Sequence, residues 1–207
     1  RGGGAPDPGP RGALLRCFIA LALPDEAKAK LTEAICRLDT GFPGARWVRQ
    51  ESFHLTLAFL GEIEGTELDC ARAAVRDSAG SGAFDLAFSG TELLPERGPA
   101  RVLALSAGAG ARECREIYGR VNRALSLAAS AAGLPPLNPE WPGGRPFRVH
   151  VTLARAGSRP FPRDSRKAWE KIEVLMQVPC RISRCILYRS YLGPGGARYE
   201  PLVSEDL

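Results

Sequence analysis

The feature that most constrains this chain is a pair of matched histidine segments. The chain has only two histidines, His54 and His150, and each is followed by threonine at the second position and by leucine at the third. Residues i and i+2 of a β-strand project from the same face. Each segment therefore predicts a strand that presents an imidazole and a hydroxyl on one face and apolar residues on the other.

Two imidazoles and two hydroxyls suit acid–base chemistry around an anion. The unperturbed imidazole pKa of about 6.5 lets one ring be neutral and the other protonated near pH 7. The alternative to a catalytic role is a structural one: each histidine would support the fold, and each threonine would be present because threonine favours strands. A catalytic zinc takes three protein ligands, and the chain has no third histidine. We therefore expect neither a metal nor another cofactor.

The composition excludes several classes of protein. Hydrophobic residues make up 44% of the 207 residues and charged residues 25%, which is ordinary globular composition. The longest apolar run, residues 17–23, is too short to cross a bilayer, so no membrane association is expected. Six scattered cysteines lack zinc-ligand spacing, which favours a cytoplasmic protein with reduced thiols.

The charge is placed unevenly along the chain. The net charge is only +5, but residues 141–199 contain twelve Lys and Arg against three Asp and Glu. Such a segment predicts either a face that meets phosphate or a solvated basic surface.

Strand and helix patterns are mixed without regular βα alternation, which predicts an α+β fold. Strand-like segments occupy residues 16–23, 53–60, 84–93, 101–106, 147–154, 181–191 and 197–203. Helical spacing of apolar residues occupies residues 24–38, 66–79, 111–132 and 165–175.

A strand–helix–strand unit occurs twice, and each copy ends in one of the histidine segments. Such a duplication predicts two lobes related by approximate symmetry. We expect residues 14–207 to form a single bilobal domain. Residues 1–13, rich in Gly and Pro, are expected to be a disordered leader or an expression remnant.

Residues 44–62 (GARWVRQESFHLTLAFLGE) and 145–155 (RPFRVHVTLAR) resemble the two HxTx signatures of the 2H phosphoesterase superfamily. More narrowly, they are similar to those of the RNA 2′,3′-cyclic phosphodiesterases, once called 2′-5′ RNA ligases. The flanking sequences match too, so the resemblance covers residues 16–202. One departure is Val149, where a proline often precedes the second histidine.

The resemblance implies a bilobal α+β fold with two antiparallel sheets flanked by helices and an active-site groove between the lobes. It also implies hydrolysis of a 2′,3′-cyclic phosphate to a 2′-phosphomonoester. His54 would be the proton donor to the leaving 3′ oxygen and His150 the proton acceptor that activates water. Thr56 and Thr152 would hold the non-bridging phosphate oxygens.

Three further residues are candidates for substrate contacts. Arg155, where the second signature ends, is the guanidinium expected to bind the phosphate, and Arg148 is the second candidate. Phe59, at the matching position of the first signature, is expected to stack on a base or to fill the core. The surface alternative stays open for both arginines.

The expected partner is an RNA or oligonucleotide end that carries a 2′,3′-cyclic phosphate, bound by a monomer. Alternatives with the same chemistry are 2′-5′ RNA ligation and hydrolysis of a small cyclic nucleotide. A non-catalytic module that binds RNA ends is the alternative from another class.

Overall fold

The computed structural model describes residues 13–38, 42, 44–144, 146–162, 165, 169, 178, 180–193 and 196–207. The helices are α1 (Asp25–Leu38), α2 (Gly65–Arg76) and α3 (Ala111–Ala131), with a short 3₁₀ helix, η2 (Gln50–Ser52). The strands are β1 (Leu15–Ala22), β2 (Ala45–Trp47), β3 (His54–Ile63), β4 (Phe84–Leu86), β5 (Phe88–Leu94), β6 (Val102–Ala107), β7 (His150–Ala156), β8 (Cys180–Ile182), β9 (Arg184–Gly193) and β10 (Gly196–Asp206).

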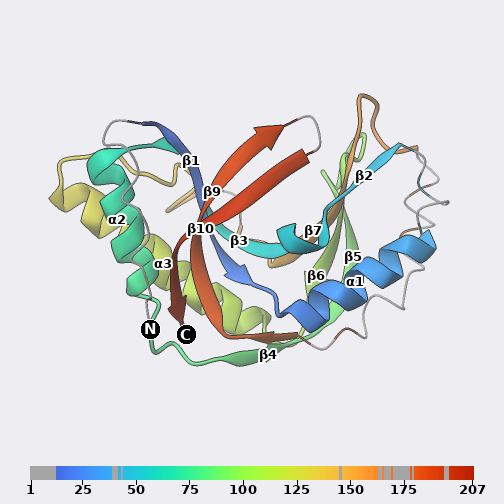
Figure 1. The fold of residues 1–207 in the computed structure, drawn as a ribbon, viewed down its shortest axis with the longest axis horizontal. Coiled ribbons are helices and arrows are strands. Elements are labelled where there is room, and N and C mark those ends of the chain that lie inside the picture. Colours follow the sequence, from blue (N-terminus) through green and yellow to red (C-terminus); the bar gives the residue numbers. More distant parts are fainter. Residues whose placement is uncertain are drawn as a thin grey trace, which may run out of the picture.

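Two four-stranded antiparallel sheets form the body of the molecule. The first has the strand order β10-β9-β1-β3 and the second the order β2-β7-β6-β5. Figure 1 shows the first sheet near the middle of the molecule and the second toward its right side. Helices α1, α2 and α3 lie outside these sheets, so the predicted α+β class is confirmed.

The duplicated unit is visible in the strand pairing. In the first sheet β3 pairs with β1, and in the second sheet β7 pairs with β6. Each histidine strand therefore lies antiparallel beside the first strand of its own unit. The two units differ in what lies on the other side of the histidine strand. Strand β7 also pairs with β2, whereas β3 is the edge strand of its sheet.

The helix of the second unit packs on the sheet of the first. Although α3 connects β6 to β7, it contacts β3 and α2. Figure 1 shows α2 and α3 at the end of the first sheet, whereas α1 lies toward the second. Buried side chains from both sheets form one continuous hydrophobic cluster. Within the described ranges, no helix has the length and apolar character of a membrane span.

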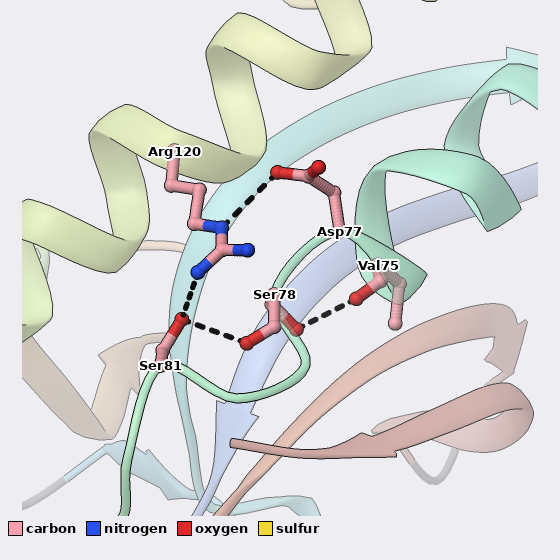
Figure 2. A network of polar contacts seen from close by, with 5 residues as sticks. All are labelled: Val75, Asp77, Ser78, Ser81 and Arg120. Atoms are coloured by element: carbon pink, nitrogen blue, oxygen red, sulfur yellow. Dashed lines mark hydrogen bonds and ion pairs between the residues drawn. The ribbon is translucent and has the colours of Figure 1, made fainter.

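The end of α2 is tied to α3 by a polar network (Figure 2). Arg120 of α3 donates from Nε to Asp77 Oδ2 at 3.1 Å and from Nη1 to Ser81 Oγ at 3.2 Å. The hydroxyls of Ser81 and Ser78 donate to the carbonyl oxygens of Ser78 and Val75 at 2.7 and 2.6 Å. Both carbonyls also accept from the backbone N–H groups of Ser78 and Ser81, so the hydroxyls add a second bond to each and tighten this turn.

Two predicted strands are wrong in their extent. Residues 84–93 divide into β4 and β5, and residues 181–191 divide into β8 and β9. After each break the chain changes sheets, because β4 and β8 pair with each other to form a separate two-stranded sheet. Apolar residues continue on both sides of each break, so the sequence pattern does not mark the change of partner.

A third difference is β2, which is three residues long and was not expected as a strand. Two other expectations fall largely outside the described residues. They are the leader, of which only residue 13 is described, and the helix over 165–175, of which only Ser165 and Trp169 are described.

Candidate active site

Both histidines lie at the first residue of their strands. His54 begins β3 and His150 begins β7, and both side chains are partly exposed. Thr56 and Thr152 follow two residues later with the same partial exposure. We call the side of each sheet that bears its histidine and threonine the histidine face. The opposite side of each strand packs into the core, as the sequence pattern predicts.

The two imidazoles are fixed in the same way. His54 Nδ1 donates to the carbonyl oxygen of Ser52 at 2.8 Å, and His150 Nδ1 donates to that of Arg148 at 2.9 Å. A carbonyl only accepts, so Nδ1 carries the proton in both rings and Nε2 is the nitrogen available for chemistry. His54 Nε2 lies 3.0 Å from Thr56 Oγ1, which places the imidazole and the hydroxyl beside a common ligand position.

A β-bulge brings Phe59 onto the histidine face of β3. Thr56 lies opposite Ala20, and Phe59 lies opposite Phe18, which leaves Leu57 as an extra residue between them. In a regular strand, residues five apart point to opposite faces. The extra residue restores the alignment, so Phe59 shares a face with His54 and is 61% exposed.

The second histidine strand has the same irregularity at the equivalent position. Thr152 pairs with Ala104 and Ala154 with Leu103, so Leu153 is the extra residue. This bulge turns Arg155 onto the histidine face although it also lies five residues after its histidine. Phe59 and Arg155 are therefore equivalent positions in the two units, one carrying an aromatic ring and the other a cation.

The carbonyl groups at the two bulges have partners from elsewhere in the chain. Asn122, buried in α3, donates to the Leu57 carbonyl at 3.3 Å and accepts a 2.6 Å hydrogen bond from the buried Asn138. The Leu153 carbonyl accepts from the Val48 backbone N–H at 2.8 Å. A bulge interrupts the strand ladder, so such partners are needed to avoid buried, unpaired backbone groups.

An aromatic cluster surrounds His54. Its ring lies 4.7 Å from Phe18, 5.3 Å from Tyr199 and 6.4 Å from Tyr188, measured between ring centroids. Phe18 and Tyr188 stack at 5.2 Å, and Phe59 lies at the cluster's exposed edge, 6.3 Å from Phe18. Sequence reasoning did not assign Tyr188 and Tyr199 to the site, because β9 and β10 carry no motif that marks them.

Strand β3 of the first sheet contacts strand β7 of the second. Burial lowers the pKa of His54 to about 4, the hydrogen bond to Ser52 opposes this, and the charges of Arg155 and His150 lower the pKa further. The charge of Arg155 also acts on the pKa of Tyr199, which burial raises. His150 and Arg155 of the second sheet therefore lie within electrostatic reach of His54 in the first.

The arginines of the basic segment take several different positions. Arg148 forms an ion pair with Glu96, so a carboxylate balances the positive charge of its guanidinium. Arg189 and Arg198 lie over the ring of Tyr191, on the face opposite Tyr199. Arg155, by contrast, lies on the histidine face of β7.

No group of three or more His, Cys, Asp or Glu side chains with the arrangement of a metal site occurs among the described residues. The site is built instead from imidazole, hydroxyl, guanidinium and phenol groups. This donor set suits a phosphate anion, which accepts hydrogen bonds from each of them.

Comparisons with known proteins identify relatives of this chain. The LigT like Phosphoesterase family matches residues 21–104, a range that includes His54. A Thermus thermophilus protein named RNA 2′,3′-cyclic phosphodiesterase is 31% identical over 196 residues, which cover 93% of this chain and 90% of that protein.

A Geobacillus stearothermophilus protein of the same name is 29% identical over 179 residues and 84% of this chain, but the chain spans only about half of it, 51%. Among solved structures, TT0787 of Thermus thermophilus superposes with a TM-score of 0.68 at 27% identity. That match covers 93% of this chain and 98% of the other.

The contacts of Asn122 predict its effect on stability. Asn122→Ala should lower the free energy of unfolding by about 1–3 kcal/mol, because it leaves the buried Leu57 carbonyl and the Asn138 amide unpaired. Urea denaturation measures the change. Arg112→Ala, which removes an exposed ion pair with Glu116, is the control and should change stability by less than about 0.5 kcal/mol. Equal midpoints for the two variants would contradict this account.

The charge of Arg155 predicts a measurable effect on His54. In the free protein, NMR titration of the ring protons should give His54 a pKa of about 4. Arg155→Gln should raise that pKa, because a nearby cation disfavours the imidazolium form. Arg181→Gln, which alters an arginine paired with Asp85, should leave the titration unchanged. The proposed convergence of the two faces fails if both variants titrate like the wild type.

Proposed function

Because this chain belongs to the RNA 2′,3′-cyclic phosphodiesterase family, we propose that it hydrolyses 2′,3′-cyclic phosphate ends of RNA or oligonucleotides to 2′-phosphomonoesters. The observation that carries the proposal is the matched pair of histidine faces. Each offers an imidazole with Nδ1 fixed and Nε2 available.

The reaction needs two proton transfers on opposite sides of one phosphorus atom. Water attacks phosphorus while His150 Nε2 accepts a proton from it. The bond from phosphorus to the 3′ oxygen breaks, and His54 Nε2 donates the proton that the leaving oxygen needs. Two imidazoles on different strands supply both transfers by themselves, so we propose a metal-independent, two-histidine mechanism.

The low pKa of His54 sets a condition on its role. At about 4, the ring is neutral near pH 7 in the free protein, whereas a proton donor must be protonated. A bound phosphate anion places negative charge beside the ring and favours the imidazolium form. Substrate binding would thus provide the protonated state that donation to the 3′ oxygen requires.

The remaining groups suit charge stabilisation and substrate positioning. Thr56 and Thr152 would donate to the non-bridging oxygens, and Arg155 would balance charge that develops on them. Phe59 is exposed beside the aromatic cluster, where a base can stack on it. Arg148 contributes only if its ion pair with Glu96 opens, so we do not assign it a substrate contact.

The central test uses an oligonucleotide with a 2′,3′-cyclic phosphate end in excess EDTA. We expect turnover to the 2′-phosphate, measured by chromatography of the products. His54→Ala and His150→Ala should each lower kcat by about 10²–10⁴-fold, because each removes one proton-transfer group. Circular dichroism of both variants serves as the folding control.

Other outcomes of this assay identify the alternatives. Binding of the cyclic end without turnover would indicate an RNA-end binding module, and activity only after zinc is added would indicate a metal enzyme. A joined product with a 5′-hydroxyl acceptor would indicate 2′-5′ ligation. Turnover of nucleoside cyclic phosphates in preference to oligonucleotides would indicate a small-molecule phosphodiesterase.

The proposed coupling between anion binding and protonation has its own test. Saturating inorganic phosphate should raise the pKa of His54 by about one unit or more, because an opposite charge within a few ångströms favours the charged ring. NMR titration with and without phosphate measures the shift, and chloride at equal ionic strength is the control. If phosphate binds but the pKa of His54 stays about 4, the donor and acceptor roles of the histidines are reversed.

A further inference from the structure

We propose that Arg46 binds the phosphodiester on the 5′ side of the terminal nucleotide, so that the site recognises an oligonucleotide end over a nucleoside 2′,3′-cyclic phosphate. This inference rests on the proposed function and specifies its substrate class. It begins from the strand register, in which Arg46 of β2 lies directly opposite Arg155 of β7.

Arg46 points to the histidine face of the second sheet. Its neighbours on β2, Ala45 and Trp47, both pack against the hydrophobic core, and Trp47 meets Phe42 edge to face at 6.0 Å. Successive residues of a strand point to opposite sides. The exposed side chain of Arg46 therefore leaves the sheet on the same side as Arg155, its cross-strand partner.

The guanidinium of Arg46 lies beside Gly157, which is farther along the chain from His150 than Arg155 is. A Cβ built on Gly157 would lie 3.6 Å from Arg46 Nε and 3.9 Å from Nη2, so the side chain extends along Gly157. Gly157 is two residues beyond Arg155, or about 6.6 Å along a strand. Along the histidine face, His150, Thr152, Arg155 and the Arg46 guanidinium thus follow one another outward.

The two arginines are like charges placed directly opposite each other on adjacent strands. Directly opposed like charges on adjacent strands destabilise a sheet. Among the described residues, neither guanidinium has a carboxylate partner, whereas Arg120, Arg148 and Arg181 each pair with one. A bound anion would remove this repulsion, and guanidinium groups match phosphate oxygens in geometry and charge.

The substrate's own geometry assigns one phosphate to each arginine. The cyclic phosphate bridges the 2′ and 3′ oxygens of the last ribose, and the next anion along the chain is the phosphodiester on its 5′ oxygen. With the cyclic phosphate at the histidines and Arg155, that phosphodiester lies one nucleotide step away. A nucleoside 2′,3′-cyclic phosphate with a free 5′-hydroxyl has no such anion.

The test compares kcat/KM for three substrates with the same terminal base. They are the nucleoside 2′,3′-cyclic phosphate, the dinucleotide with a cyclic end, and that dinucleotide with a neutral methylphosphonate linkage. For the wild type, the charged dinucleotide should exceed the methylphosphonate by about tenfold or more, the worth of one charge-assisted hydrogen bond. Arg46→Gln should remove that preference for the charged linkage.

The matched control is Arg181→Gln, which makes the same change of net charge at an exposed arginine paired with Asp85. It should keep the wild-type preference. The preference is a ratio of rates in one protein sample, so a partly folded variant does not distort it. If Arg46→Gln keeps the wild-type ratio, or the wild type shows no preference, the inference is overturned while the phosphodiesterase stands. If the wild type turns over none of the substrates, the proposed function itself fails.

Discussion

The candidate site depends on one extra residue in each histidine strand. Phe59 and Arg155 lie five residues after their histidines, an odd spacing that a regular strand would turn toward the core. The bulges at Leu57 and Leu153 reverse that orientation. Without the second bulge, the Arg155 guanidinium would face the apolar side of β7, where an unpaired charge costs several kcal/mol. Strand irregularity thus places Phe59 and Arg155 beside the histidine–threonine pairs, which regular alternation places by itself.

Each bulge is supported by the other half of the molecule. Leu57 belongs to the first unit, and its carbonyl is bonded by Asn122 of α3, which lies in the second. Leu153 belongs to the second unit, and its carbonyl is bonded by Val48, which follows β2 in the first. Neither histidine strand keeps its shape through its own unit alone. We infer that the two lobes fold together as one domain, in line with their continuous core.

The sequence predicts the parts of this structure that depend on local periodicity. The alternation at His54–Thr56 and His150–Thr152 is a property of a strand. The sequence therefore predicts correctly that each histidine shares a face of its own strand with the threonine two residues later. The bulges were not predicted, because the leucine that becomes the extra residue looks like any other core residue.

Contacts between distant segments also could not be predicted from the sequence. Tyr199 reaches His54 only because β10 and β9 add to the sheet beside β1, and Arg46 reaches Arg155 through a strand of three residues. Neither pairing leaves a periodic signal in the chain. The pairing of Arg148 with Glu96, 52 residues apart, likewise depends on tertiary structure.

The anchoring of both rings by the segments that lead into their own strands has a mechanical consequence. Each imidazole is oriented by a carbonyl two residues before it, so its tautomer and direction are set without help from the opposing sheet. A shift of one sheet against the other would leave each ring's hydrogen bond to its own carbonyl intact, while it would change the distance from His54 to the charge of Arg155. The relative position of the sheets would thus set the acidity of His54 without altering its tautomer.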